Sequence, residues 1–313
     1  MVKHIEGKHS RMSDVSKITG GRYKAVQLAG SGNGGDVWFC VRLSPFLETE
    51  PTSFRSSILN TEDIDELRQL YAVKVPPPRR RDLLVPELAA LERLASLFSP
   101  NRQYVQQLVD YDKPSDILKD PAWLASHAVM GCSIIQLRLA TGHTPIPKPL
   151  ILHIAMQASA ALAALHNREA KMTHGDIHDG NFMLDVEKRD EEGRPTVVLI
   201  DFDVHQGTLQ LGMFYDLRFF FIVMKSLVDL NRFDQPPTID VGWRKFESFV
   251  TEFGGVWEPD EIPPIEGFLT EFEEYSTQTW IEMTSEDRNQ IEILLEKASE
   301  GAKKARANAH KML

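Results

Sequence analysis

Two short segments of this chain carry the residue types that bind metal ions and move protons. The first is the loop His174-Gly175-Asp176-Ile177-His178-Asp179-Gly180-Asn181, and the second is an apolar run, residues 196–200, that ends in Asp201. A carboxylate that closes a buried strand loses hydration and needs a strong partner such as a metal ion. These segments, in this order, predict a site for phosphoryl transfer.

Asp176 and Asn181 stand in one loop at the spacing D-x-x-x-x-N, which lets a carboxylate face a hydroxyl while an amide binds metal. We expect Asp176 to accept or orient the proton of the acceptor hydroxyl. Asn181 and Asp201 would hold Mg²⁺ between the β- and γ-phosphates of ATP. A turn-capping role is the alternative for Asp201. His174 is expected to be a packed anchor of the loop, and Asp216 is expected to accept bonds from loop amides.

A glycine-rich segment lies near the start of the chain. Residues 30–37, Gly30-Ser31-Gly32-Asn33-Gly34-Gly35-Asp36-Val37, match the pattern G-x-G-x-x-G-x-V. A dinucleotide-binding loop must open into a helix, whereas this segment continues as a strand. We therefore expect a hairpin whose backbone amides can approach phosphates, with an ordinary flexible hairpin as the alternative.

Lys74 lies in the short apolar strand 70–75, where a lysine more often points to solvent. The following segment changes this interpretation, because Glu87, Leu91, Leu94 and Phe98 fall on one face of a helix. A carboxylate on an apolar face needs a cation, so Glu87 is expected to pair with Lys74 and hold its ammonium against the α- and β-phosphates. Glu92 is expected in solvent.

The elements that must position these residues can be placed from periodicity and breakers. Strands are expected over 23–28, 36–43, 70–75, 104–111 and 126–130, helices from about Pro86, over 149–167 and over 216–230, and a hairpin with arms 181–186 and 196–200. Three regions follow: a flexible leader over 1–22, an N-terminal lobe over 23–130 with an insertion at 44–69, and a C-terminal lobe over 131–313.

Taken together, these motifs resemble the eukaryotic-type protein kinase superfamily over residues 23–230. The resemblance implies an α+β, bilobal fold with a small β-rich N-lobe, a larger mainly helical C-lobe and Mg-ATP in the cleft between them. It implies that Ala72 and Met183 line the adenine and that residues 130–133, beginning at Met130, form the hinge. The ATP-binding residues would further include Gly30, Ser31, Gly32, Gly35, Val37 and Lys74.

The chain also departs from the protein kinase pattern. Gly175 follows His174 where those enzymes have arginine, and Asp203 replaces the glycine after Phe202. The sequence His-Gly-Asp-x-His-x-Gly-Asn, with His178 at a position where γ-phosphate contact is expected, looks like the loop of aminoglycoside-type phosphotransferases. The segment 201–216 is short and lacks an Ala-Pro-Glu signature.

Three functions follow from this resemblance. The first is an ATP-dependent phosphotransferase acting on a hydroxyl, with a protein Ser/Thr acceptor favoured by the N-terminal half. The second is a small-molecule kinase of the aminoglycoside or choline type. The third is an ATP-binding pseudokinase scaffold.

Composition bounds the function classes. The 313 residues carry a formal charge of −10, which disfavours nucleic acid as a partner. The sequence lacks an apolar run of the length that a membrane span requires. Two cysteines indicate a reducing compartment, so the cytoplasm is the expected location, with the nucleus left open. The oligomeric state has no signature in the sequence.

Overall fold

The structure is a computed structural model that describes residues 12, 14–43, 69–97, 100–113, 120–142, 144–202, 208–230, 240–255, 258 and 262–312. Nearly all of the expected insertion at 44–69 lies outside these residues, as do Phe98 and Asp203. The chain divides into two compact units. The sheet unit comprises Met1–Ala89, Gln107–Ala128 and Gly301–Leu313, and the helical unit comprises Ala90–Gln106 and Val129–Glu300.

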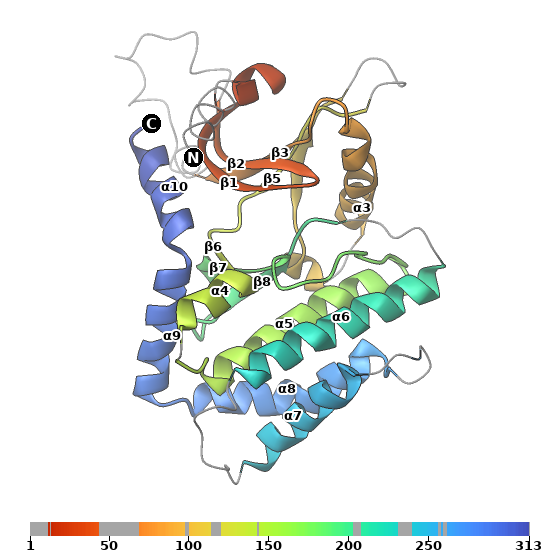
Figure 1. The fold of residues 1–313 in the computed structure, drawn as a ribbon, viewed down its shortest axis with the longest axis vertical. Helices are drawn as coiled ribbons and strands as arrows, with labels where there is room; N and C mark the ends of the chain where they lie inside the picture. Colours follow the sequence, from red (N-terminus) through yellow and green to blue (C-terminus); the bar gives the residue numbers. More distant parts are fainter. Residues whose placement is uncertain are drawn as a thin grey trace. The chain divides into compact units, whose positions relative to one another are not determined.

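A five-stranded antiparallel sheet forms the sheet unit (Figure 1). Its strands are β1 (Tyr23–Gly32), β2 (Gly35–Arg42), β3 (Leu70–Val75), β4 (Leu108–Tyr111) and β5 (Leu124–His127), in the spatial order β1-β2-β3-β5-β4. The β1–β2 connection is a two-residue turn, because Gly32 pairs with Gly35. Gly35 has φ +125°, and a Cβ there would lie 2.3 Å from the carbonyl oxygen of Val75, so this position requires glycine.

The core of the sheet unit lies on one face of the sheet. Its largest members are Tyr23, Trp38, Tyr71 and Trp123, each at most 2% exposed. Residues 14–18, which the sequence analysis placed in a polar leader, are helical. One of these residues, Val15, belongs to the core of the sheet unit and is 2% exposed. The mostly polar composition of residues 14–18 gave no sign of this packing, because Val15 is the one residue among them that belongs to the core cluster.

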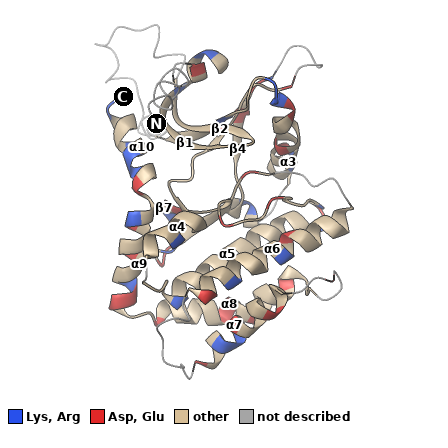
Figure 2. Ribbon diagram, viewed as in Figure 1, with Lys and Arg blue, Asp and Glu red and all other residues tan. Residues whose placement is uncertain are grey.

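The last helix, α10 (Glu300–His310), belongs almost wholly to the sheet unit, although the sequence analysis placed it in the C-terminal lobe. Its buried positions are all alanines, Ala302, Ala305 and Ala309. Its other positions include basic residues, blue in Figure 2. The Gln27 side chain on β1 donates to the carbonyl oxygen of Gly301 at 3.2 Å. The small residues allow the helix to lie close to its neighbours.

The helical unit contains a small antiparallel sheet of three strands, β6 (Gly131–Ser133), β7 (Phe182–Arg189) and β8 (Pro195–Leu199). Its helices include the second half of α3 (Leu84–Ser96), the short 3-10 helix η4 (Pro100–Tyr104), α4 (Ile134–Thr141), α5 (Lys148–His166), α6 (Leu209–Asp229), α7 (Val241–Phe253), α8 (Ile265–Ile281) and α9 (Ser285–Ala298). Figure 1 shows α5 and α6 side by side. Phenylalanines of α6, α7 and α8 pack between these helices, with Phe221 edge to face on Phe268 and Phe246 edge to face on Phe272.

In the described part of the chain, α5 is the one helix whose length and apolar composition would suffice to cross a membrane. Of its apolar window, 78% is buried inside the protein, as in the core helix of a folded domain. The helix begins with Pro149 in its first turn, where the missing N–H costs nothing.

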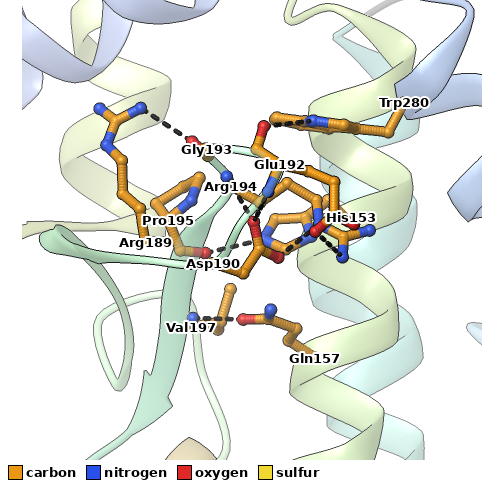
Figure 3. Close-up of polar contacts among 10 residues, drawn as sticks. All are labelled: His153, Gln157, Arg189, Asp190, Glu192, Gly193, Arg194, Pro195, Val197 and Trp280. Carbon is orange, nitrogen blue, oxygen red and sulfur yellow. Dashed lines mark hydrogen bonds and ion pairs between the residues drawn. The ribbon is translucent and has the colours of Figure 1, made fainter.

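Two side chains of α5 bind the free edge of β8 (Figure 3). The His153 Nε2 atom lies 2.7 Å from the carbonyl oxygen of Pro195, and the Val197 N–H donates to Gln157 Oε1 at 2.6 Å. The His153 ring also packs against Trp280 at a tilt, with ring centroids 5.3 Å apart. One face of α5 therefore supplies polar partners to the outer edge of β8, the last strand of its sheet among the described residues.

The burial of His153 predicts that the protein becomes less stable as the pH is lowered. Burial lowers the pKa of His153 from 6.5 to about 4, so the unfolded chain binds a proton that the folded protein excludes. Stability should therefore fall as the pH drops below about 6.5, and between pH 7.5 and 5 this histidine should account for about 2 kcal/mol of the loss. Urea unfolding of the wild type and His153→Gln at both pH values measures it. Equal pH dependence in the two proteins would contradict the prediction.

Candidate active site

The glycine-rich hairpin and Lys74 lie together within the sheet unit. Val37 on β2 is the register partner of Lys74 on β3. A Cβ on Gly34, at the turn, would lie 3.1 Å from Lys74 Cε and 3.2 Å from Nζ, so the turn covers the end of the lysine side chain. The predicted hairpin is confirmed as two paired strands. Its turn brings backbone atoms beside an ammonium group.

Gly30 and Gly32 have no internal reason to be glycine. A Cβ at either position would meet no atom within 4 Å, and neither has a positive φ. The neighbouring Ser31 hydroxyl bonds to the Asp36 carboxylate across the hairpin. The open space beside the two glycines leaves their backbone accessible to a ligand such as a phosphate.

The predicted pairing of Lys74 with Glu87 is confirmed. Lys74 Nζ donates to Glu87 Oε2 at 2.6 Å, and the two residues are only 8% and 1% exposed. Glu87 lies in the first turn of α3, on the face that also buries Leu91 and Leu94, whereas Glu92 is exposed as expected. A buried pair of this kind fixes the lysine ammonium in one direction because neither charge can return to water alone.

The adenine and hinge residues expected from the resemblance occupy strands or their ends. Ala72 is central in β3, between Phe39 of β2 and Ser126 of β5. In the helical unit, Met130 precedes β6 and is 4% exposed, and its carbonyl oxygen accepts the Val186 N–H at 3.1 Å. Met183 on β7 is the register partner of Ser133.

The loop before β7 is anchored by Asp216 of α6, as predicted. Asp216 is 1% exposed and accepts the His174 N–H at 2.7 Å and the Gly175 N–H at 3.0 Å. The His174 ring packs against Phe202 at a tilt, with ring centroids 4.8 Å apart, and its Nε2 donates to the carbonyl oxygen of Ile200 at 2.9 Å. Burial lowers the pKa of His174, so the imidazole is neutral and structural. Gly175 has φ +86°, a conformation that the arginine of protein kinases could adopt only with strain.

Asp176 and Asn181 meet in this loop. Asn181 is 5% exposed, and its Nδ2 donates to the Asp176 carbonyl oxygen at 2.9 Å and to Oδ2 at 3.5 Å. With the nitrogen used inside the loop, Oδ1 is the Asn181 atom that could bind a metal ion. The Asp176 side chain is 52% exposed, so its carboxylate is open to an acceptor.

His178 lies on the same loop with a defined ring orientation. Its Nδ1 accepts the Gly180 N–H at 2.9 Å, so the neutral ring carries its proton on Nε2. Nε2 lies 3.5 Å from Asp176 Oδ2. The ring therefore directs a donor toward the carboxylate expected to act on the acceptor hydroxyl.

Asp201 follows β8 in a left-handed conformation with φ +65°, which costs a non-glycine residue about 1–2 kcal/mol. The N–H of the preceding residue, Ile200, donates to the Asn181 carbonyl oxygen at 3.0 Å. This backbone hydrogen bond connects the two segments that carry the expected metal ligands, Asn181 and Asp201. No group of three or more His, Cys, Asp or Glu side chains suited to a metal occurs in the described residues. Two protein oxygens suit Mg²⁺, which keeps waters and takes its other ligands from phosphates.

Three further side chains hold these residues, and the sequence analysis missed them. Gln106 Oε1 accepts the Asp201 N–H at 2.9 Å. Arg138 of α4 binds Asp179 of the loop at 2.6 Å. His166, at the end of α5, lies 3.0 Å from Asp216 Oδ2. Each lies far along the chain from its partner, so spacing carries no signal of the contact.

No protein-family model and no curated protein matches this sequence. Among solved structures, the chain is similar to the crystal structure of the PknI kinase domain of Mycobacterium tuberculosis. The similarity covers 81% of this chain and 96% of that chain, with a TM-score of 0.52 and 17% identity. The chain has a bilobal, protein-kinase-like α+β fold. The sheet unit has the β-rich character of the small lobe of this fold, and the helical unit has the character of the larger lobe.

Within the kinase-like fold, the expected site residues fall into two groups. The sheet unit brings together Lys74, Glu87 and the glycine-rich hairpin. The helical unit brings together Asp176, His178 and Asn181. Asp201 is the residue after Ile200, whose N–H donates to the Asn181 carbonyl oxygen. Each group therefore holds together within its own unit the residues that the sequence predicted for it.

Proposed function

We propose that this protein transfers the γ-phosphate of Mg-ATP to a hydroxyl acceptor. The observation that carries the proposal is the buried pair of Lys74 and Glu87 beside the glycine turn. A lysine that only stabilised the sheet would be better replaced by an apolar residue, because a buried pair rarely gains net stability. The presence of a buried lysine next to the glycine turn therefore favours a role for Lys74 in holding the triphosphate.

The residues of the helical unit supply the chemistry. Asp176 would orient the acceptor hydroxyl and take its proton as the hydroxyl oxygen bonds to the γ-phosphorus and the bond from that phosphorus to the bridging oxygen breaks, which releases ADP. His178 would hold the Asp176 carboxylate through Nε2–H. His174 and Asp216 keep the loop backbone fixed, so Asp176 needs little reorganisation before reaction.

Asn181, through Oδ1, and Asp201, through its carboxylate, are the residues that would hold Mg²⁺. When bound, this ion would neutralise charge on the β- and γ-phosphates. The donor set fits the ion, because it consists of one carboxylate and one amide oxygen and leaves positions for phosphate and water.

For the acceptor, we propose a small hydroxyl compound. Helix α6 begins at Leu209, capped by Thr208, well before Asp216. Residues 203–208 are therefore all that separate Phe202 from the helix. A protein acceptor, favoured by the N-terminal half of the sequence, requires a platform for an extended peptide, and this short connection offers little length for one. A small compound requires only the loop that carries Asp176.

Metal removal tests the proposal. We expect label from γ-labelled ATP to appear on an acceptor in a library of alcohols, aminoglycosides and Ser/Thr proteins, only when Mg²⁺ is present. Asp201→Asn should reduce the transfer rate at least about 100-fold because the metal loses its one charged protein ligand. Asp120→Asn, an equal charge change at an exposed position, is the matched control.

The outcomes separate the competing functions. Label on protein alone would overturn the small acceptor. Stabilisation by ATP without label on any acceptor would favour the pseudokinase scaffold. Transfer that persists in excess EDTA would contradict the metal site.

A further inference from the structure

The outer edge of β8 is held by three side-chain contacts and one backbone contact. Strand β8 is the last in its sheet, with β7 on its inner side. Along the outer edge, alternate residues each have a partner: Pro195 O faces His153, Val197 N–H donates to Gln157, Leu199 O accepts the Gln106 N–H, and Asp201 N–H donates to Gln106 Oε1. Figure 3 shows the first two of these contacts. The alternation is that of a β-ladder.

The last two contacts come from a single residue. The Gln106 backbone N–H donates to Leu199 O at 2.9 Å, next to the parallel bridge between Val105 and Leu199. Its side-chain oxygen then accepts the Asp201 N–H, also at 2.9 Å. The side chain thus continues the outer ladder from Leu199 to Asp201, two residues further along the chain.

The Asp201 N–H belongs to the residue that adopts the left-handed conformation. Both polar groups of the preceding residue are already held, since Ile200 N–H donates to Asn181 O and His174 Nε2 donates to Ile200 O. A non-glycine residue keeps φ +65° only where its surroundings fix it. Gln106 supplies the remaining fixed contact at the Asp201 amide.

We propose that Gln106 is a positioning residue, which holds Asp201 in the backbone conformation that directs its carboxylate to Mg²⁺. This inference rests on the proposed role of Asp201 as a metal ligand. Partners behind a metal ligand commonly set metal affinity by 10- to 100-fold, and a backbone contact acts in the same way on ligand direction. Gln106 and Asp201 both belong to the helical unit.

The test compares three variants. Gln106→Met keeps the side-chain length and removes the acceptor, whereas Gln106→Glu keeps an acceptor oxygen. Gln157→Met is the matched control, because it removes the same kind of contact from the same strand edge, at Val197 instead of Asp201. Two quantities are measured: hydrogen–deuterium exchange at the Asp201 amide without nucleotide, and the Mg²⁺ concentration for half-maximal stabilisation by a nonhydrolysable ATP analogue.

In Gln106→Met we expect the Asp201 amide to exchange at least about tenfold faster, as for the loss of one buried hydrogen bond. The Mg²⁺ requirement should rise about 10- to 100-fold, while analogue binding without Mg²⁺ is unchanged. Gln106→Glu should stay near the wild type, and Gln157→Met should alter neither quantity. Unchanged amide exchange in folded Gln106→Met would overturn the proposal, as would an equal Mg²⁺ effect in Gln157→Met. If Gln106→Met does not fold, loss of Asp201 protection in Gln106→Glu would overturn it.

The proposed function fails separately from this inference. A wild type that shows no Mg²⁺-dependent nucleotide binding contradicts the role of Asp201 in metal binding. The Asp201 amide still reports whether Gln106 holds the backbone.

Discussion

Replacing Asp176 by Asn is expected to abolish phosphate transfer and to leave nucleotide affinity unchanged. The Asp176 carboxylate is half exposed, and the contact that ties the loop together at this residue runs from Asn181 to its backbone carbonyl. The substitution therefore removes a proton acceptor without removing the loop. A base in this position contributes about 10²- to 10⁴-fold to the rate.

The rate is measured by single-turnover transfer from γ-labelled ATP, and the affinity by titration with a nonhydrolysable analogue. The unfolding midpoint of Asp176→Asn should lie close to that of the wild type, which serves as the control for folding. A variant that transfers phosphate within a few fold of the wild-type rate would show that Asp176 is not the base.

Separating the buried pair of Lys74 and Glu87 should have the largest effect on stability. Glu87→Leu leaves the Lys74 ammonium buried without its carboxylate, and Lys74→Met leaves the carboxylate without its ammonium. Each single variant should lose about 3–5 kcal/mol of the free energy of unfolding. The double variant should lose much less, because two apolar side chains then pack where two charges stood.

Urea unfolding of the four proteins forms a double-mutant cycle for this pair. Single losses that add up in the double variant would contradict the coupling. A stable double variant that still binds ATP as tightly as the wild type would contradict the role of Lys74 in holding the triphosphate.

The sequence predicted the Lys74–Glu87 pair and the glycine-rich hairpin better than the long-range contacts that support the loop. Lys74, Glu87 and the glycine-rich hairpin could be placed because each breaks a local rule: a lysine in an apolar strand, a glutamate on an apolar helix face, glycines inside a strand pattern. The contacts of Asp216 with the loop were predicted for a related reason, since an aspartate in an apolar helix needs donors.

The element boundaries and long-range supports could not be predicted in the same way. Helix α6 begins at Leu209, about two turns before the expected start at Asp216, because Thr208 caps it and Gly212 lies close to Thr173. The run 104–111 is a strand only from Leu108, because Pro100–Tyr104 forms a 3-10 helix instead. Gln106 looks like an ordinary polar residue between these elements.

The C-terminal third shows the same limit. Helix α10 carries several basic residues, but the positions that it buries are alanines. Alanine every third or fourth residue also suits an exposed helix, so the pattern alone does not distinguish the two cases.

The most direct test of the account is calorimetric titration of the wild type with a nonhydrolysable ATP analogue and Mg²⁺. We expect one nucleotide per chain, with affinity at least about tenfold weaker in Lys74→Met, as for the loss of a charge-assisted contact to phosphate. A folded wild type that binds no nucleotide at millimolar concentration would contradict the central claim.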